Sequence, residues 1–335
     1  VGLTTCMLIL FFVADEKSYD KYNEAKDRIY RVDGDIQFGG NHFILAVCPE
    51  PMGPTLKKDF PAVKQFIRFR NYGGMLVKKG NSNIREDKVI FTDSTLFDVF
   101  TLPMIAGDPR TALTEPKSVV ITEKIAEKYF NSTDVVGKSL VYNDTGNLKI
   151  TGVIKDVPKQ SHFNFDFFIS LNGSIQDWEK NQWVSNNLNT YILLNKNADP
   201  KKLESQLDAF AERYMGPQVK SILNTEMADF KKSGNFVHYT LTPLTDIHLH
   251  SNKTSELGAN SSVQYVYIFS IIAALVLMIA CVNFMNLSTA RSSSRSKEVG
   301  VRKVLGSMRG NLISQFLVES LVISLIALIL AIGLA

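Results

Sequence analysis

The chain has 335 residues, of which 45% are hydrophobic and 21% are charged, as in an ordinary folded protein. Charged residues are absent from residues 1–14 and 263–287, whereas residues 288–312 contain six basic residues and one acidic residue. Residues 15–262 contain equal numbers of basic and acidic residues. A soluble nucleic-acid binder would instead place its basic residues over one folded face, with aromatic or motif support, so this class is excluded.

The first predicted element is a helix over residues 1–14. A membrane-spanning helix needs about 20 residues, so this stretch alone is too short to cross a bilayer. Because the chain has no initiating Met, we interpret the stretch as the outer half of a first membrane helix rather than as a signal peptide. Asp15 and Glu16 follow it, which suits an exit on the extracytoplasmic side. The sequence also stops within an apolar run, and we therefore expect a protein truncated at both ends.

Residues 15–262 are predicted to form an α+β domain, because strand and helix patterns alternate along them. Two β-α-β units lie at the two ends of this domain, each with two strands around a helix. The predicted strands lie at 28–37, 63–70, 189–195 and 236–244, and the predicted helices at 52–59 and from the Asp199 N-cap and Pro200 to Gly216-Pro217. Such paired units commonly form one split β-α-β sheet from both ends of a segment.

The middle of the domain, about residues 96–187, is predicted to be an inserted mixed α/β subdomain, which gives the domain two subdomains. The predicted elements of the insert are a strand at 119–121, a helix at 123–130, and a hairpin of strands 138–142 and 148–157 across residues 143–146. Cys48 is the only cysteine of the domain, because Cys6 and Cys281 fall in the membrane segments. No disulfide can close within the domain, so a packed core must stabilise it.

One segment of the insert, Val136-Gly137-Lys138-Ser139, resembles the end of a phosphate-binding loop. That motif requires a glycine five residues before its second glycine, and here the position is Ser132. The predicted topology also places the segment outside the cell membrane, away from ATP. We therefore interpret it as a polar turn that leads into a strand.

A second candidate site is Asp246, His248 and His250, which alternate along a stretch that we expect to be extended. Their side chains would then share one face and could ligate a metal ion. The other histidines are scattered without metal-site spacing, and the motifs of zinc proteases, serine hydrolases and thiol redox proteins do not occur. Ordinary polar residues at a strand end are the interpretation that we prefer. We predict no catalytic residue, no cofactor and no metal.

Residues 263–287 are predicted to form the second membrane helix. This stretch of 25 uncharged residues is longer, at about 1.5 Å per residue, than the roughly 30 Å hydrocarbon core of a bilayer. Short loops rich in basic residues stay in the cytoplasm, so residues 288–312 lie inside and residues 15–262 outside. Residues 313–335 then return outward as a third membrane helix, with Glu319 close enough to the interface to avoid the full cost of burial.

An amphipathic helix is predicted within residues 288–312, which we refer to as the basic segment. Its apolar face contains Val301, Val304, Leu305 and Met308, and an i,i+4 pair of Glu298 and Arg302 lies on another face. Such a helix could rest on anionic lipid headgroups, an attraction of about 1 kcal/mol per basic residue. Gly300 and Gly306 would each cost that helix about 1 kcal/mol, and they favour a turn and a close approach to another protein surface.

Residues 295–307 read Arg-Ser-Lys-Glu-Val-Gly-Val-Arg-Lys-Val-Leu-Gly-Ser, which resembles the signature of FtsX-like and MacB-like ABC transporter permeases. In that family a basic residue precedes Glu-Ile-Gly-Ile-Arg, followed by Lys, Ala, a small apolar residue, Gly and Ala. This chain has Val299 and Val301 in place of the isoleucines and Ser307 in place of the last alanine. Residues 315–319, Gln-Phe-Leu-Val-Glu, resemble the start of the family's next helix.

The external domain is similar to the periplasmic core domain of this family. The similar stretches, which follow the family's order, are residues 92–97, 102–107, 119–122, 126–138 and 151–158. The resemblance thus covers nearly the whole chain. It implies two subdomains in the periplasmic part, in agreement with the predicted split sheet and its insert.

The resemblance also implies a permease that does not itself hydrolyse ATP and is therefore not an enzyme. In the family, the loop between the second and third spans docks against a separate cytoplasmic ATPase. Dimerisation of that ATPase on ATP moves the membrane helices and reshapes the periplasmic domains, a process called mechanotransmission. The residues of this chain that match the docking loop are Arg295, Lys297, Glu298, Gly300, Arg302, Lys303 and Gly306.

We therefore expect a permease subunit of the bacterial inner membrane that exports or extracts a substrate on the periplasmic side, as in efflux. The expected partners are a cytoplasmic ABC ATPase, membrane lipid, and a second permease in a homodimer or heterodimer; a periplasmic adaptor and an outer-membrane channel are further candidates, and nucleic acid is not. The alternative is an FtsX-like signalling or regulatory protein that controls a periplasmic partner such as a cell-wall hydrolase. An enzyme with an external active site is a more distant third hypothesis.

Overall fold

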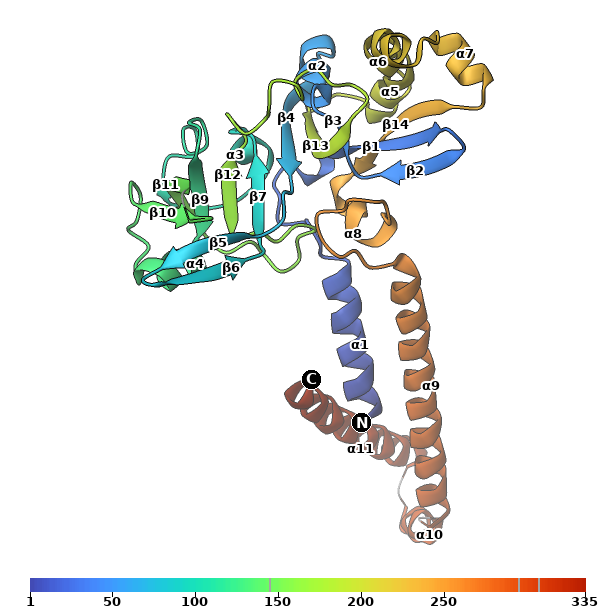
Figure 1. Ribbon diagram of the computed structural model, residues 1–335. Coiled ribbons are helices and arrows are strands. Elements are labelled where there is room, and N and C mark those ends of the chain that lie inside the picture. Colours follow the sequence, from blue (N-terminus) through green and yellow to red (C-terminus); the bar gives the residue numbers. More distant parts are fainter. Residues whose placement is uncertain (145, 295, 307) are drawn as a thin grey trace. The chain divides into compact units, whose positions relative to one another are not determined.

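The chain forms two compact units. We refer to Tyr19–Asn260 as the sheet unit, and to Val1–Ser18 together with Ser261–Ala335 as the helical unit. The computed structural model in Figure 1 describes residues 1–144, 146–294, 296–306 and 308–335, without the side chains of residues 291–298, 309 and 312.

Four strands from the two ends of the sheet unit build the split β-α-β sheet. They follow the order β14-β1-β13-β4, and each neighbouring pair is antiparallel. Their bounds are Ile29–Phe38 for β1, Val63–Arg70 for β4, Asn186–Leu194 for β13 and Phe236–Pro243 for β14. The connections contain α2 (Met52–Asp59) between β1 and β4, and α5 (Pro200–Glu204), α6 (Leu207–Leu223) and α7 (Met227–Lys232) between β13 and β14. The predicted split sheet is thereby confirmed.

The prediction that one helix runs from Pro200 to Gly216-Pro217 is wrong. Two helices follow Pro200, and α6 continues through Pro217 to Leu223. A residue before proline normally leaves the α region because its Cβ meets the proline ring, but Gly216 has no Cβ. The helix therefore passes the proline and ends where Asn224 adopts a left-handed φ of 51°.

Eight further strands between β4 and β13 continue the same sheet. The β4–β7 pair joins them to the first four strands through Phe69 opposite Thr92 and Arg70 opposite Phe91. Among the described residues the order is β14-β1-β13-β4-β7-β12-β9-β11-β10-β5-β6, with β2, β3 and β8 paired beside this path. These eight strands are β5 Met75–Lys79, β6 Ser82–Glu86, β7 Val89–Thr92, β8 Met104–Gly107, β9 Ser118–Thr122, β10 Ser139–Tyr142, β11 Gly146–Ile154 and β12 Phe167–Ser170.

The predicted hairpin of the insert is present as β10 and β11, with Tyr142 opposite Gly146. Asn143 and Asp144 have left-handed φ values of 46° and 66°, which suit a tight hairpin turn. The predicted helix of the insert is α4, Glu123–Phe130. Thr145, also in the predicted turn, lies outside the described residues.

The strand pairing supports an insert that begins earlier than about residue 96. Strands β5 and β6 form a hairpin, and β5 pairs with β10 through Val77 and Tyr142. The insert would then begin near Met75, and its status as a separate subdomain remains a prediction.

Several short elements were not predicted from the sequence. Strand β12 is buried along its whole length, so it lacks the alternation that marks a half-buried strand. In addition to β5–β8 and β12, the unpredicted elements are β2 Asn41–Leu45, β3 Cys48–Pro49, α3 Leu96–Val99, α8 Ile247–His250 and the 3₁₀ helices Lys26–Arg28 and Leu244–Asp246.

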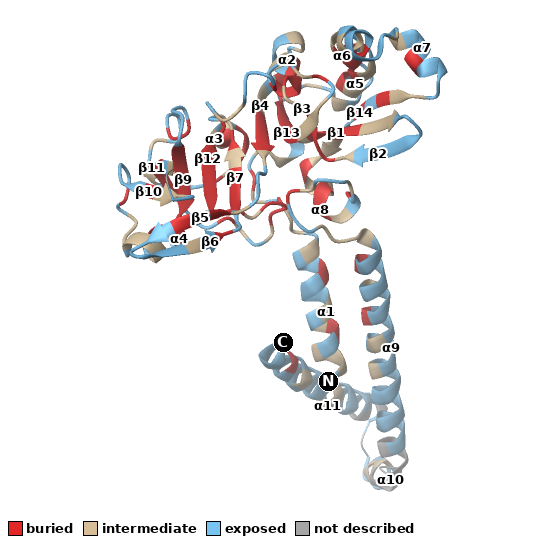
Figure 2. Ribbon diagram, viewed as in Figure 1, coloured by how far each residue is buried: buried red, intermediate tan, exposed pale blue. Residues whose placement is uncertain are grey.

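Most residues of the central strands are buried, as Figure 2 shows, and they belong to cores on both faces of the sheet. On one face Ile192 of β13 belongs to a core that includes Leu56 of α2 and Phe210 of α6. On the other face Tyr191 belongs to a core that includes Phe100. The strands of the insert enclose a third core with α4. Strand β13 therefore lies between two cores.

The helical unit contains α1 (Gly2–Glu16), α9 (Val263–Ser294), α10 (Ser296–Val304) and α11 (Arg309–Leu334). Among the described residues, Val263–Ala290 and Ile313–Leu334 are long and apolar enough to span a membrane. Helices α1 and α9 pack closely: a Cβ on Gly2 would lie 2.7 Å from Ala280 Cβ, and the rings of Phe12 and Phe269 are 5.1 Å apart.

Candidate functional site

The basic segment folds as the end of α9, the helix α10 and the beginning of α11. Gly306 has a φ of +89°, in the left-handed region that favours glycine, and it turns the chain after α10. Gly300 lies inside α10, where an added Cβ would meet no described atom within 4 Å. The backbone conformation at position 306 therefore accounts for Gly306, whereas no contact with the described residues accounts for Gly300.

The four residues of the predicted apolar face are exposed, but only Val301 and Val304 belong to α10, because the helix ends before Leu305 and Met308. Val301 is 61% exposed, Val304 88%, Leu305 79% and Met308 75%. We refer to these four residues as the apolar strip. Soluble surfaces rarely present contiguous large apolar side chains, which mark contacts with a protein or a membrane.

The structure places only part of the predicted docking loop. Arg302 of α10 donates from Nη1 to Gln315 Oε1 of α11 at 2.8 Å, and Lys303 is exposed. Arg295 lies outside the described residues, as do the side chains of Lys297 and Glu298, although the last two belong to α10. The predicted pair of Glu298 and Arg302 therefore remains a prediction, and the role of the loop is untested.

Of the two weaker motifs, Val136-Gly137-Lys138-Ser139 forms a turn into β10, with Gly137 at a φ of +91°. The prediction of an extended stretch at residues 246–250 is wrong, because His248 and His250 lie in the short helix α8. His248 is buried, whereas His250 is exposed, so the two do not share a face. Within the described part of the chain, no group of three or more His, Cys, Asp and Glu residues could hold a metal ion.

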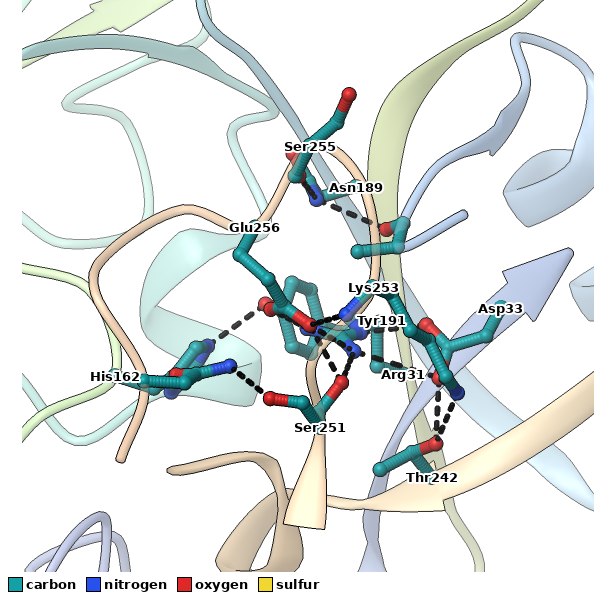
Figure 3. Close-up of polar contacts among 12 residues, drawn as sticks. Arg31, Asp33, His162, Asn189, Tyr191, Thr242, Ser251, Lys253, Ser255 and Glu256 are labelled. Atoms are coloured by element: carbon teal, nitrogen blue, oxygen red, sulfur yellow. Dashed lines mark hydrogen bonds and ion pairs between the residues drawn. The ribbon is translucent and has the colours of Figure 1, made fainter. Parts of the chain in front are cut away.

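Sequence reasoning missed a cluster of charged side chains inside the sheet unit (Figure 3). Arg31 of β1, fully buried, donates from Nε to Asp33 Oδ1 at 2.6 Å and from Nη1 to Glu256 Oε2 at 2.5 Å. Its Nη2 donates to Ser251 Oγ at 2.7 Å. Lys253 Nζ donates to the second oxygen of Asp33 at 2.5 Å. We refer to Arg31, Asp33, Ser251, Lys253 and Glu256 as the Arg31 cluster.

The Arg31 cluster is balanced in charge, since two cations face two carboxylates. Burial alone would raise the pKa of Glu256, but the hydrogen bond and the charge of Arg31 hold that pKa below its ordinary value of 4.5. Burial would lower the pKa of Arg31, and its interactions with Tyr191, Asp33 and Glu256 outweigh this and raise it. Arg31 and Glu256 therefore both carry their charges at neutral pH.

A second buried group lies on the same face of the sheet. His162 Nδ1 is 2.9 Å from Asp20 Oδ1, and His162 Nε2 is 2.7 Å from the hydroxyl of Tyr191. Asp20 is fully buried and His162 is 3% exposed. Tyr191 of β13 lies directly opposite Arg31 of β1, so this group borders the Arg31 cluster. We refer to Asp20, His162 and Tyr191 as the His162 triad.

A signal for the Arg31 cluster was present in the sequence. Arg31 and Asp33 alternate with Val32 in a predicted strand, so both would point to one face of a sheet. Charged residues on a buried strand need partners of opposite charge. The partners come from residues 251–256, more than 200 positions later, and no local pattern connects them to β1.

Comparison with known families matches residues 1–210 to the MacB-like periplasmic core domain and residues 270–335 to the FtsX-like permease C-terminal region. YknZ, an uncharacterized ABC transporter permease of Bacillus subtilis, is 24% identical over 215 residues, which are 64% of this chain and 47% of YknZ. The macrolide export ATP-binding/permease protein MacB of Neisseria gonorrhoeae is 23% identical over 242 residues, 71% of this chain and 33% of that protein. The chain spans less than half the length of these relatives.

Among solved structures, a domain described as part of a permease from Porphyromonas gingivalis aligns with a TM-score of 0.55 at 21% identity, over 73% of this chain and 98% of that one. This likeness concerns the fold of the mixed α/β sheet. The first family match covers more than half of the chain, and the second includes the basic segment, the apolar helix Ile313–Leu334 and most of the apolar helix Val263–Ala290. The chain therefore belongs to the MacB-like and FtsX-like family of ABC transporter permeases, membrane proteins with a periplasmic domain.

Proposed function

We propose that the chain is the permease part of an ABC transporter whose basic segment binds a separate cytoplasmic ATPase. Dimerisation of that ATPase on ATP moves the membrane helices and reshapes the sheet unit, which drives export or extraction of a substrate on the periplasmic side. The chain lies in the bacterial inner membrane, with residues 15–262 in the periplasm, and it contributes no catalytic residue.

The observation that carries the proposal is the apolar strip beside basic residues. Val304 and Leu305 are 88% and 79% exposed, and Lys303 lies between Arg302 and this pair in the sequence. An interface with a protein combines an apolar centre with a polar rim. The contact of Arg302 with Gln315 ties α10 to α11, so a force on α10 would reach an apolar helix.

A resting position on lipid headgroups is the competing explanation of the same strip and charges. A substitution at Gly300 distinguishes a contact with lipid from a contact with a protein. A helix on lipid gains from alanine in place of glycine, by up to about 1 kcal/mol. A helix whose backbone approaches another protein at position 300 loses, because the methyl group enters that contact.

The test is Gly300→Ala in the full-length protein, purified with its partner and with the partner identified as an ABC ATPase by mass spectrometry. We expect roughly tenfold weaker ATPase binding, equivalent to about 1.4 kcal/mol, with membrane insertion unchanged. The matched control is Gly333→Ala in α11, where an added Cβ also meets nothing within 4 Å.

Unchanged ATPase binding by Gly300→Ala would contradict the proposed contact at Gly300. Leu305→Asp is a second variant whose ATPase binding is measured. Its control is Ile222→Asp, because Ile222 is an exposed apolar residue on α6 of the sheet unit. If weakened binding abolished activation of a periplasmic hydrolase and left export unaffected, the regulatory alternative would replace the transporter.

A further inference from the structure

The sheet unit is joined to the helical unit at two places in the chain, after Ser18 and before Ser261. The first connection continues from α1 and the second leads into α9. Both connections contain residues with buried polar contacts. These contacts lie wholly within the sheet unit.

At the first connection, Asp20 is the fixed point. Its carboxylate accepts from the backbone N–H of His162 at 3.3 Å and lies 2.9 Å from His162 Nδ1, and its backbone N–H donates to Gln160 O at 2.8 Å. Asn23, 1% exposed, adds a hydrogen bond from its amide Nδ2 to Asp20 O at 3.2 Å and one from the backbone N–H of Thr101 to its Oδ1 at 3.0 Å. The chain is therefore held within two residues of Ser18.

At the second connection, Glu256 is the fixed point. Arg31 binds it with two nitrogens, Nη1 at 2.5 Å and Nη2 at 3.1 Å, and Ser251 Oγ donates to it at 2.5 Å. The flanking backbone is held as well. Thr254 exchanges hydrogen bonds with the backbone of Ala46 and Ile44 at 2.9 Å each, which pairs this stretch with the end of β2.

The two connections also meet each other. The rings of Tyr19 and His248 stack with centroids 3.3 Å apart, which joins the first connection to α8. A Cβ added to Gly258 would lie 2.7 Å from the carbonyl oxygen of His162, so the second connection passes against the residue that holds Asp20. Tyr191 and Arg31 lie opposite each other on β13 and β1, so His162, which holds Asp20, and Glu256 bind side chains of adjacent central strands.

We propose that the Arg31 cluster and the His162 triad form one anchor, which fixes both connections to the central strands so that a displacement of α1 and α9 reaches the sheet as one movement. This inference rests on the proposed function, because it concerns how movement of the membrane helices is passed on. A relay of this kind needs rigid, directional contacts, which satisfied buried polar networks supply.

The arrangement is more specific than stability requires. A well-packed apolar replacement for a buried ion pair is often equally stable, so the charged groups are not needed for the core itself. Their value here is geometric: bidentate contacts of Arg31 hold Glu256 in one orientation. The anchor residues are thus positioning residues for the transmitted movement.

The test compares Glu256→Gln and Tyr191→Phe in the full-length protein with its ATPase, using hydrogen exchange with and without ATP and vanadate. Each substitution keeps the shape of the side chain and removes one link. We expect amide exchange to rise at least tenfold in both residues 19–23 and residues 251–260, whichever side carries the substitution. We also expect the ATP-dependent change in exchange of the sheet unit to be lost while ATPase binding persists.

Leu148→Ala is the control for a merely structural role, because Leu148 is 1% exposed in the core of the insert and away from the anchor. It should destabilise the sheet unit yet keep the ATP-dependent change. Faster exchange in the substituted connection alone, or an ATP-dependent change that survives both anchor variants, would overturn the anchor. An unmodified protein without any ATP-dependent change in the sheet unit would instead overturn the proposed function, and the exchange of the two connections would still decide the anchor.

Discussion

Replacing Arg31 by methionine should destabilise the sheet unit by about 3 kcal/mol, at the low end of the 3–5 kcal/mol typical when one partner of a buried ion pair is removed. Arg31→Met keeps the length of the side chain and removes the guanidinium. It breaks the contacts to Asp33 at 2.6 Å and Glu256 at 2.5 Å, and it leaves the buried carboxylate of Asp33 and the partly buried carboxylate of Glu256 without the guanidinium. The low end applies because Asp33 retains Lys253 at 2.5 Å and Glu256 retains the hydroxyl of Ser251 at 2.5 Å.

Urea unfolding followed by tryptophan fluorescence measures this loss. Both tryptophans of the chain lie in the sheet unit, Trp178 exposed and Trp183 buried, so the signal reports that unit. The control is Arg85→Met, since Arg85 and Asp87 form an exposed pair in which both side chains are at least 70% exposed. Such pairs contribute about 0–1 kcal/mol, and the control should stay within that range.

The double variant with Arg31→Met and Glu256→Gln sharpens the reasoning. Removing the orphaned carboxylate should recover about 1–2 kcal/mol of the loss, so the two substitutions should not be additive. A loss below about 1 kcal/mol for Arg31→Met, or strict additivity of the two substitutions, would refute the view that charge pairing holds this cluster together.

Three further predictions concern pH, packing and topology. The folded-state pKa of Glu256 is held below 4.5, so its contribution to stability is present above that pH and is lost as the pH falls through the lower folded value. The free energy of unfolding of the sheet unit should therefore fall in acid. In urea titrations across pH 3–6, this free energy should fall less steeply for Glu256→Gln than for the unmodified protein. Gly53→Ala in α2 should destabilise by about 1–3 kcal/mol, against the usual gain from alanine in a helix, because the new Cβ would lie 2.6 Å from the ring of Phe66; unchanged stability in the same unfolding assay would show that the ring yields freely. A cysteine at Lys303 should be protected from a membrane-impermeant thiol reagent in intact cells, and one at the 86%-exposed Arg110 should react; the reverse pattern would invert the proposed topology.

The sequence was sufficient where local rules decide the structure. The bounds of α2 and α4 follow from periodicity and breakers, and the hairpin of β10 and β11 follows from its turn residues. The split sheet was predictable because its two β-α-β units carry separate local patterns. Helical spacing likewise predicted α10 with Val301 and Val304 on it, but the helix ends at Val304, so Leu305 and Met308 of the predicted face lie beyond it.

The remainder depends on contacts between distant segments. The strand order around β4 and β7 is set by two residue pairs, which leave no trace in local composition. The Arg31 cluster depends on a return of residues 251–256 to β1, and α8 forms where alternation predicted an extended stretch. In α8, four residues are too few for periodicity to distinguish a helix from a strand.

The position of β13 bears on how this protein acquires its structure during synthesis. Strand β13 lies between β1 and β4, and its residue Leu194 pairs with Val63, so the centre of the split sheet stays empty until the whole insert has emerged. Contacts of such long sequence separation slow folding, and the unpaired edges of β1 and β4 meanwhile remain open to association with other chains. A nascent chain at this stage needs shielding from other chains, and variants that delay completion of the insert should be lost to aggregation and proteolysis more than to altered equilibrium stability.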